Sequence, residues 1–400
     1  MKHTTKNSSF YHLKATIIVL LMLFSQLLLA QLSTPVQIDM EPFADNTHHW
    51  YDIFNKENMI NPLPGKPQYK PTEITKIADN ILLMQKNNGG WAKNYDVFAI
   101  LTDAQKDSVI TAKKELNTTF DNGNTFTQIA ALAITYTATK VDKYKKGVLK
   151  GLDFILQSQY KNGGWPQYFP LESDYSRCIT YNDGAMAGIM KLIKDINDNK
   201  PQYAFVDKKY REKLMFAYNK GLDCIIKTQI IDNGKPNAWC QQYNEVTLEP
   251  AWARKFEPPC ICNKESAELV LLLMSIDNPS KEIIDAVQNA VVWFQESKIY
   301  NTRVKKINAE RVVTQFKVST ADRVVVIDST APTIWTRYYE LKTHRPMFCN
   351  RDSKVVYSLA EVARERRDGY GWYVYSPQEV LDNYLEWQKK WATDKNMLKN

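Results

Sequence analysis

Hydrophobic residues recur at helical spacing in three segments that end in the same way. The segments are ADNILLMQKNNGGW (78–91), GLDFILQSQYKNGGW (151–165) and GLDCIIKTQIIDNGKPNAW (221–239). In each segment, apolar residues three and four positions apart predict a helix, which an Asn-Gly or Gly-Gly pair then ends. A tryptophan follows each break, and the three tryptophans stand 74 residues apart: Trp91, Trp165 and Trp239. The pattern predicts a repeat.

A second type of helix follows each tryptophan. Residues 124–141, 184–198 and 266–277 are apolar on most sides, which is typical of buried helices. Two helices in about 74 residues make a helical-hairpin repeat, with amphipathic outer helices and apolar inner ones. We therefore predict a mainly α fold, an α/α toroid (an incomplete α/α barrel). Further helices are expected at 282–296 and 376–391, and a few short strands within 312–329.

The tryptophans end helices of one type, so we expect them at one mouth of the ring. Aromatic side chains dominate packing, which favours a corner plug for each of them. Trp165 is also a candidate for contact with a ligand at that mouth.

The inner helices begin with acid and amide side chains. The sequences are DNG at 121–123, NDG at 182–184 and NKE at 263–265. Asp and Asn at these positions are either helix N-caps or ligands at the mouth. Tyr181, Asn182 and Asp183 offer three polar groups in one turn, and the glycine that follows lets a ligand approach. Clustered oxygen ligands of this kind suit Ca²⁺.

The first 30 residues differ from the rest of the chain. Three lysines precede an apolar run over 17–30, about the length found in a signal peptide and short for a membrane span. An uncleaved anchor is the alternative. We predict a signal peptide (1–30), an N-terminal extension or linker (31–70) and one toroid domain (71–400). The expected location is secreted or periplasmic, with no stable membrane insertion after cleavage.

Composition excludes several classes of function. The formal net charge of +8 falls to +5 on removal of residues 1–31, which carry three lysines and no acids. That surplus permits an anionic ligand, and no nucleic-acid motif accompanies it. Six cysteines between 178 and 349 are free or paired structural thiols, without zinc-finger spacing.

Histidine is scarce after the predicted signal peptide, where only His48, His49 and His344 remain. Catalytic triads, Cys-His pairs and multi-histidine zinc sites are therefore unexpected. The chain also has no phosphate-binding loop and no dinucleotide fingerprint. Carboxylates, tyrosine, lysine and arginine remain as sources of chemistry.

Arginines in the second half of the chain stand beside aromatic residues. Arg254 lies in EPAWARKFEPP and Arg337 in WTRYYEL, while ARERRDGYGWY carries Arg364, Arg366 and Arg367. Guanidinium groups bind carboxylates through two hydrogen bonds and stack on aromatic rings. The run 364–367 is equally compatible with a solvated charged face.

Eight segments together resemble the polysaccharide lyase family 10 pectate lyases. They span about 75–375: NGGWAKN, DNGNTFTQI, NGGWPQYFP, TYNDGAM, WCQQYNEVTLEPAWARKFEPP, DSTAPTIWTRYYEL, RPMFCNRD and YSLAEVARERRDGYGWY. The resemblance implies an α/α toroid that cleaves polygalacturonate by β-elimination with Ca²⁺. It further implies a calcium-associated Asp183 and an arginine base on the C5 proton, Arg254 as first choice and Arg337 as second. By the same resemblance, the residues that contact substrate are Lys93, Arg337, Arg351 and Arg366.

One departure from the family pattern concerns the metal. Tyr243-Asn244 stands where the resemblance leads us to expect His-Asp, and Glu245 is a possible substitute. The expected metal ligands are thus Asn182, Asp183, Asn244 and Glu245.

Two other functions compete with a calcium-dependent lyase. An inverting glycoside hydrolase on the same type of barrel would use two carboxylates, such as Asp183 and Glu265. A non-catalytic pectin-binding relative would catalyse neither elimination nor hydrolysis. The expected partner is polygalacturonate, no nucleic acid is expected, and the protein is expected to be a monomer.

Overall fold

The computed structural model describes residues 35–49, 66–314 and 318–398 of the chain. The predicted signal peptide lies outside the described residues. Within these ranges, no helix combines the length and apolar character that crossing a bilayer requires.

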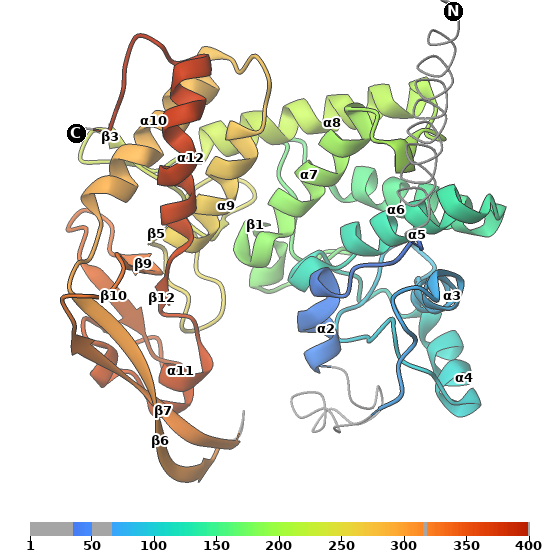
Figure 1. Ribbon diagram of the computed structural model, residues 1–400, viewed down its shortest axis with the longest axis horizontal. Helices are drawn as coiled ribbons and strands as arrows, with labels where there is room; N and C mark the ends of the chain where they lie inside the picture. The colour runs from blue at the N-terminus through green and yellow to red at the C-terminus, as the bar shows by residue number, and fades with distance from the viewer. Residues whose placement is uncertain (1–34, 50–65, 315–317, 399–400) are drawn as a thin grey trace, which may run out of the picture.

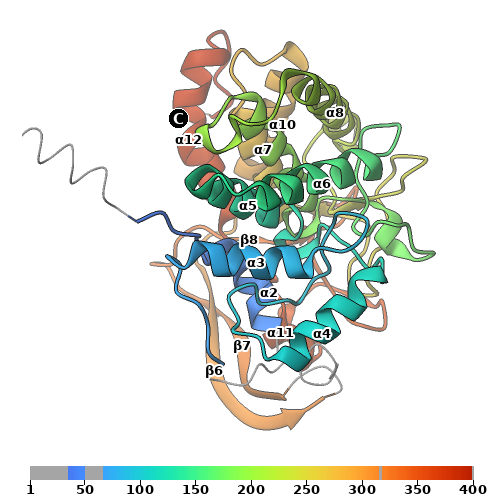
Figure 2. The ribbon, with the colours of Figure 1, turned by 90° about the vertical axis from the view of Figure 1, so that its right-hand side faces the viewer.

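Eight longer helices form two layers (Figures 1 and 2). The amphipathic outer helices are α3 (Ile74–Met84), α6 (Asp142–Ser158), α8 (Lys208–Lys227) and α10 (Lys281–Glu296). The inner helices are α5 (Phe126–Thr139), α7 (Ala185–Asn197), α9 (Asn263–Met274) and α12 (Ser376–Trp391). Successive inner helices pack side by side, and each also packs on an outer helix. The predicted α/α toroid is confirmed, and α5, α7 and α9 occupy the three segments expected to be inner helices.

The repeated tryptophans are core plugs at equivalent corners. Trp91, Trp165 and Trp239 are fully buried. Each indole Nε1 donates to a carbonyl of the outer helix that precedes it, at 2.8 Å to Ile81, 2.9 Å to Ile155 and 2.7 Å to Ile225. A buried indole N–H needs such a partner, so the hydrogen bond fixes the chain after each outer helix.

The glycines of the corners bring consecutive repeats together. Gly89 and Gly163 have φ values of 101° and 96°, which glycine adopts without strain. A Cβ on Gly163 would lie 1.9 Å from the Lys220 carbonyl oxygen of α8, so only glycine allows this approach. A glutamine also connects each corner to the next outer helix. The side chains of Gln85, Gln159 and Gln229 each donate two hydrogen bonds, one to a carbonyl of their own corner and one to a carbonyl of the next outer helix.

Short strands close the arginine-rich end of the molecule. A four-stranded antiparallel sheet has the order β11 (Val355–Val356), β10 (Pro346–Cys349), β9 (Tyr338–Tyr339) and β5 (Ile261–Cys262). Three two-stranded sheets pair β1 (Ile179–Thr180) with β4 (Gln242–Tyr243), β2 (Ile231–Asp232) with β3 (Lys235–Pro236), and β8 (Trp335–Thr336) with β12 (Tyr373–Val374). A long hairpin of β6 (Thr302–Val313) and β7 (Val318–Ile327) begins ten residues before the region predicted as strand.

The described part of the N-terminal extension is docked on the toroid. Ile38 and Phe43 are buried in the core, and the Asn46 side chain donates to the Asn122 carbonyl at 2.7 Å. This contact places η1 (Glu41–Phe43) and α2 (Ala44–His49) beside the turn that precedes α5. Residues 35–49 thus form one wall of the mouth.

Candidate active site

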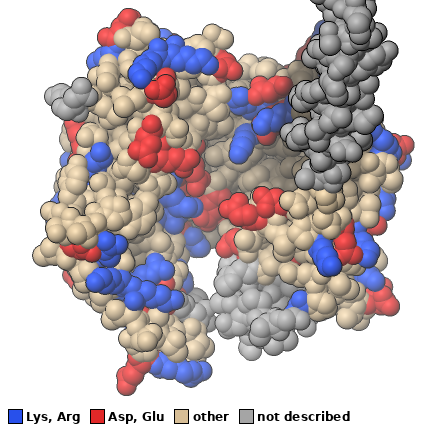
Figure 3. Space-filling model, in the orientation of Figure 1, with Lys and Arg blue, Asp and Glu red and all other residues tan. Residues whose placement is uncertain are grey.

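A cavity of about 1310 Å³ opens at the mouth, where α7 and α9 begin. Figure 3 shows a hollow on this face of the molecule, with acidic and basic side chains along its rim. The charged residues that line the cavity are Glu41, Asp45, Asp183, Lys191, Lys194, Asp195, Asp198, Lys200, Arg254, Lys264, Glu268, Arg337 and Arg366. Tyr370 and the turn around it form the wall near Arg366.

Asp183 reaches this cavity because of its backbone conformation. It is the middle residue of η6 (Asn182–Gly184) and has φ 49° and ψ 34°, a left-handed conformation that Asp tolerates better than most residues. Asn122 has nearly the same conformation in the equivalent turn η4 (Asp121–Gly123), which packs against η6. Neither Asp121 nor Asp183 caps a helix through its side chain, so the capping interpretation of these acids is wrong.

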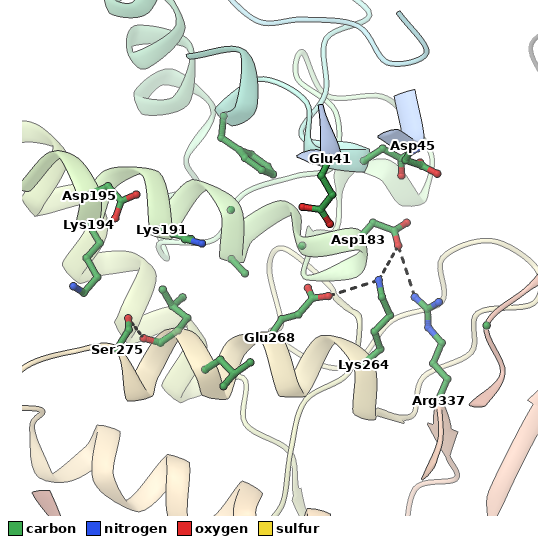
Figure 4. A pocket seen from close by; sticks show the side chains of 18 of the residues that line it. Glu41, Asp45, Asp183, Lys191, Lys194, Asp195, Lys264, Glu268, Ser275 and Arg337 are labelled. Atoms are coloured by element: carbon green, nitrogen blue, oxygen red, sulfur yellow. Dashed lines mark hydrogen bonds and ion pairs between the residues drawn. The ribbon is translucent and has the colours of Figure 1, made fainter. Parts of the chain in front are cut away.

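Positive and negative groups alternate around Asp183 (Figure 4). Its Oδ1 lies 3.3 Å from Lys264 Nζ and 3.9 Å from Arg337 Nη2, and its Oδ2 accepts from Asn182 Nδ2 at 2.6 Å. Arg337 Nη2 also donates to Asn182 Oδ1 at 3.1 Å and forms an ion pair with the fully buried Glu265. The Cys262 thiol donates to the other Glu265 oxygen at 2.5 Å. The contacts with Asn182 and Glu265 hold the Arg337 guanidinium in position.

The network shifts the pKa values of the carboxylates in opposite directions. Burial alone would raise the pKa of Asp183, but Lys264, Arg337 and Arg254 outweigh it and hold that pKa below its usual value. Burial raises the pKa of Glu268 to about 7, although Lys264, 3.7 Å away, pulls in the opposite direction. Asp183 is therefore ionised at neutral pH, while Glu268 is divided between its two forms.

Three guanidinium groups surround the ring of Phe256. The Cζ atoms of Arg254, Arg351 and Arg366 lie 4.9, 5.0 and 4.6 Å from its centroid, as in cation–π contacts. Arg366 also lies 5.2 Å from the centroid of Tyr370. Arg254 and Arg366 of this cluster also line the cavity, so two guanidinium groups face it from this wall.

The arginines of the site differ in their partners. Both oxygens of Glu257 bind Arg254, with Nε–Oε2 at 2.8 Å, and the ion pair raises the pKa of Arg254 despite burial. Burial opposes the charge of Arg337 too, but Glu265 raises its pKa. Burial lowers the pKa of Arg366, and the nearby Arg351 and Arg254 add to that effect.

Two residues expected to contact substrate lie in the core instead. Trp165 is fully buried at its corner, and the Tyr181 hydroxyl is buried in a 2.7 Å hydrogen bond with Thr228. Neither side chain reaches the cavity, so the structure corrects both assignments. Trp165 is a packing residue, as the corner-plug interpretation predicts, because its indole N–H donates to the Ile155 carbonyl within the repeat.

Three more predicted residues lie outside the lining of the cavity. Lys93 forms an ion pair with Asp121 at 2.8 Å, and Arg351 binds Glu365 at 2.9 Å. Glu245 pairs with Arg177 at 2.6 Å. They stabilise the loops around the mouth.

Asn244, expected as a metal ligand, also lies outside the lining. Its Oδ1 accepts from the amides of Val246 and Thr247, both at 2.9 Å. Asn244 and Glu245 are thus committed to loop contacts. Asn182 is buried outside the lining as well, so of the four expected metal ligands Asp183 alone lines the cavity.

Ca²⁺ is the metal ion expected at this cavity, and it takes oxygen ligands. Within the described ranges, no three His, Cys, Asp or Glu side chains lie close enough to hold a metal ion. The cavity does carry oxygen ligands, from Glu41, Asp45, Asn122, Asp183 and Glu268. Because Ca²⁺ takes six to eight oxygens, an ion at Asp183 would need most of its coordination from water or from a carboxylate-bearing ligand.

Sequence reasoning gave no role to two charged residues of the site. Lys264 and Glu268 stand four positions apart at the start of α9, on one helical face, and both line the cavity. That spacing was visible in the sequence as a possible signal. The spacing could not show that Asp183 lies opposite these two side chains.

The sequence profile described as pectic acid lyase matches residues 85–381. The chain belongs to this family. No curated protein matches by sequence.

Solved structures agree with the pectic acid lyase assignment. A family 10 polysaccharide lyase from Cellvibrio cellulosa is 27% identical, with a TM-score of 0.66, and the match covers 78% of this chain and 91% of that one. An aspartate-to-alanine mutant of a family 10 polysaccharide lyase from the same organism, in complex with trigalacturonic acid, is 26% identical with the same TM-score; the match covers 78% of this chain and 92% of that one. The resemblance read from the motifs is confirmed, and the protein is a polysaccharide lyase.

The hydrolase alternative loses Glu265, the second carboxylate named for it, in this pectic acid lyase. Glu265 is fully buried, and its two oxygens bind Arg337 and Cys262. An inverting hydrolase needs a carboxylate that reaches water or the glycosidic oxygen. Glu265 reaches neither.

Proposed function

We propose that the protein is a pectate lyase that cleaves polygalacturonate by Ca²⁺-assisted β-elimination. The observation that carries the proposal is the ionised Asp183 at the rim of a wide cavity, in contact with Lys264 and close to Arg337. The complex of a similar lyase with trigalacturonic acid supports the substrate class.

The reaction demands stabilisation of negative charge. A base removes the proton from C5 of a galacturonate, the C4–O bond breaks, and a C4–C5 double bond forms while the departing oxygen takes up a proton. Loss of the C5 proton moves negative charge onto the adjacent carboxylate. Fixed cations facing that carboxylate lower the barrier, since they need no reorganisation as the charge develops. Arg254, Arg366 and Lys264 line the cavity and supply such charge.

The geometry favours Arg337 over Arg254 as the base. Arginine has a pKa above about 12, so it accepts a proton only where positive charge disfavours its protonated form. Each candidate is held in its protonated form by a carboxylate, Arg254 by both oxygens of Glu257 and Arg337 by the buried Glu265, so these ion pairs do not separate the two. Arg337 is the guanidinium nearest Asp183, so positive charge bound at that carboxylate acts on it most strongly.

Asp183 would hold the Ca²⁺ ion, together with other oxygens of the cavity and carboxylates of the substrate. When bound, the ion would neutralise the uronate carboxylate and make its C5 proton more acidic. Asn182 keeps Asp183 oriented through the 2.6 Å hydrogen bond. Lys264 would give up part of its contact with Asp183 and turn to substrate.

We further propose export of the protein to the cell surface or periplasm, where a polymeric substrate is accessible. The support is the N-terminal pattern of lysines and apolar residues. The monomeric state remains a prediction.

The test is ultraviolet absorbance of purified residues 32–400 on polygalacturonate, with Ca²⁺ and then with a chelator. A calcium-dependent rise is expected, because elimination creates a double bond that absorbs. New reducing ends without this absorbance would overturn the lyase in favour of hydrolysis. Binding without either product would overturn it in favour of a pectin-binding protein.

A further inference from the structure

The cavity extends far beyond the reacting groups, along one face of α7. The residues of this helix and its N-terminal turn that line it follow helical spacing: Gly184, Ala187, Gly188, Lys191, Lys194, Asp195 and Asp198. Fourteen positions at 1.5 Å each give a groove about 20 Å long. The opposite side is α9, which contributes Lys264, Glu268, Leu271, Leu272 and Ser275. Figure 4 shows the two helices running alongside each other away from Asp183.

The charges along this groove are mostly neutralised in pairs. Lys194 Nζ lies 2.5 Å from Asp198, and Lys200 Nζ lies 3.0 Å from Asp195. Lys191 stands between these pairs and Asp183, exposed, and has no ion pair among the residues that the structure describes. The middle of the groove therefore presents one uncompensated cation.

Small residues separate Lys191 from the reacting end. Ala187 and Gly188 line the groove there, and a Cβ on Gly188 would lie 2.3 Å from the ring of Phe126, so the position admits no larger side chain. Phe126 also lines the cavity, so small residues and an aromatic ring form its floor between Asp183 and Lys191, a surface on which a sugar ring can lie. Lys191 stands eight positions after Asp183, which corresponds to about 12 Å along the helix.

We propose that Lys191 forms a distal subsite that binds the carboxylate of a galacturonate several sugars away from the cleaved bond. Polygalacturonate carries one carboxylate on each sugar, so a chain lying along α7 brings one of them to this ammonium. The inference rests on the proposed function. It assigns the enzyme a preference for long chains, because short oligomers bound at Asp183 end before they reach Lys191.

The test measures kcat/KM on trigalacturonate and on polygalacturonate for the wild type, Lys191→Gln and Lys191→Glu. An exposed ion pair is worth a modest free energy, so Lys191→Gln is expected to lower kcat/KM on the polymer by about twofold to fivefold. Lys191→Glu adds repulsion and is expected to lower it further. Neither variant should change kcat/KM on the trimer. Lys146→Gln, an exposed lysine of outer helix α6, is the matched control and should change neither value.

Equal values for wild type and both Lys191 variants on the polymer would overturn the subsite, and so would equal losses on trimer and polymer. Failure of the proposed function looks different, because the wild type would then give no unsaturated product from either substrate. In that case calorimetric binding of a long oligogalacturonide decides. Weaker binding by Lys191→Gln than by Lys146→Gln supports the subsite, and equal binding rejects it.

Discussion

Lys264 Nζ lies 3.3 Å from Oδ1 of Asp183, although 81 positions separate them in the chain. Each residue stands at the beginning of an inner helix. Because successive inner helices begin at the same mouth, the repeat brings together groups that no local sequence connects. This contact lies at the end of the groove where we place the reaction.

Asp183→Asn is expected to lower turnover of polygalacturonate by about 100-fold or more, because it removes the charge that would hold the ion and orient Arg337. Calorimetric binding of Ca²⁺ in the presence of oligogalacturonate should weaken in parallel. Asp107→Asn, on the exposed helix α4 (Asp103–Thr111), is the control for loss of one acid. Full activity of Asp183→Asn would remove this residue from the mechanism.

Arg337→Lys and Arg254→Lys should change different kinetic constants. Lysine at 337 cannot contact Asn182 and Glu265 together with the geometry of a guanidinium, so we expect kcat to fall by about 100-fold or more. Arg254→Lys should mainly raise KM, since Arg254 lines the cavity in which we place the substrate carboxylates. The measurement is steady-state kinetics, with near-ultraviolet circular dichroism as a check on folding. The reverse pattern would assign the base to Arg254.

Glu268 should make stability depend on pH. Its pKa rises from 4.5 to about 7 on folding, so between these values the folded protein keeps a proton that the unfolded chain releases. The free energy of unfolding contributed by this group therefore falls as pH rises from 4.5 to 7. Glu268→Gln cannot ionise and should gain stability relative to wild type over that window.

Urea unfolding at pH 4.5, 6 and 8 measures the effect. The control is Glu212→Gln at an exposed position of α8. A constant difference in stability between wild type and Glu268→Gln at all three pH values would contradict the assignment.

Trp165→Ala should destabilise the protein by about 3–5 kcal/mol, the usual cost of emptying an aromatic site in a core. Trp165→Phe should cost less but still lose the hydrogen bond to Ile155. Because Trp165 does not reach the cavity, KM of the folded Trp165→Phe protein should equal that of wild type. A raised KM with unchanged stability would restore a role in substrate binding.

The sequence was most informative about the repeat. The spacing of Trp91, Trp165 and Trp239 and the apolar pattern of the following helices predicted the toroid, because each repeat must bury its own aromatic residue and its own inner helix. It also marked Asp183, Arg254 and Arg337, which line the cavity. Polar and charged residues in aromatic or glycine-rich segments are visible without a structure.

The sequence was least informative about which polar side chains face solvent. Tyr181 and Asp183 are two positions apart, but one lies in the core and the other in the cavity, because Asp183 adopts a left-handed conformation. The sequence predicted Asn244 and Glu245 as metal ligands, but Asn244 binds loop amides and Glu245 pairs with Arg177. Such differences depend on partners far away in the chain.

Local sequence therefore determined the elements of this protein, their two-layer order and the residue types available for chemistry. Helical periodicity and glycine-tryptophan corners depend on interactions within a few turns of the chain. Only the tertiary structure decided that Asp183, Lys264 and Arg337 meet, that Glu265 is shielded, and that Lys191 lies unpaired in the groove among the described residues. The reason is physical: electrostatic partners and burial are properties of positions in space, and here those positions come from different repeats.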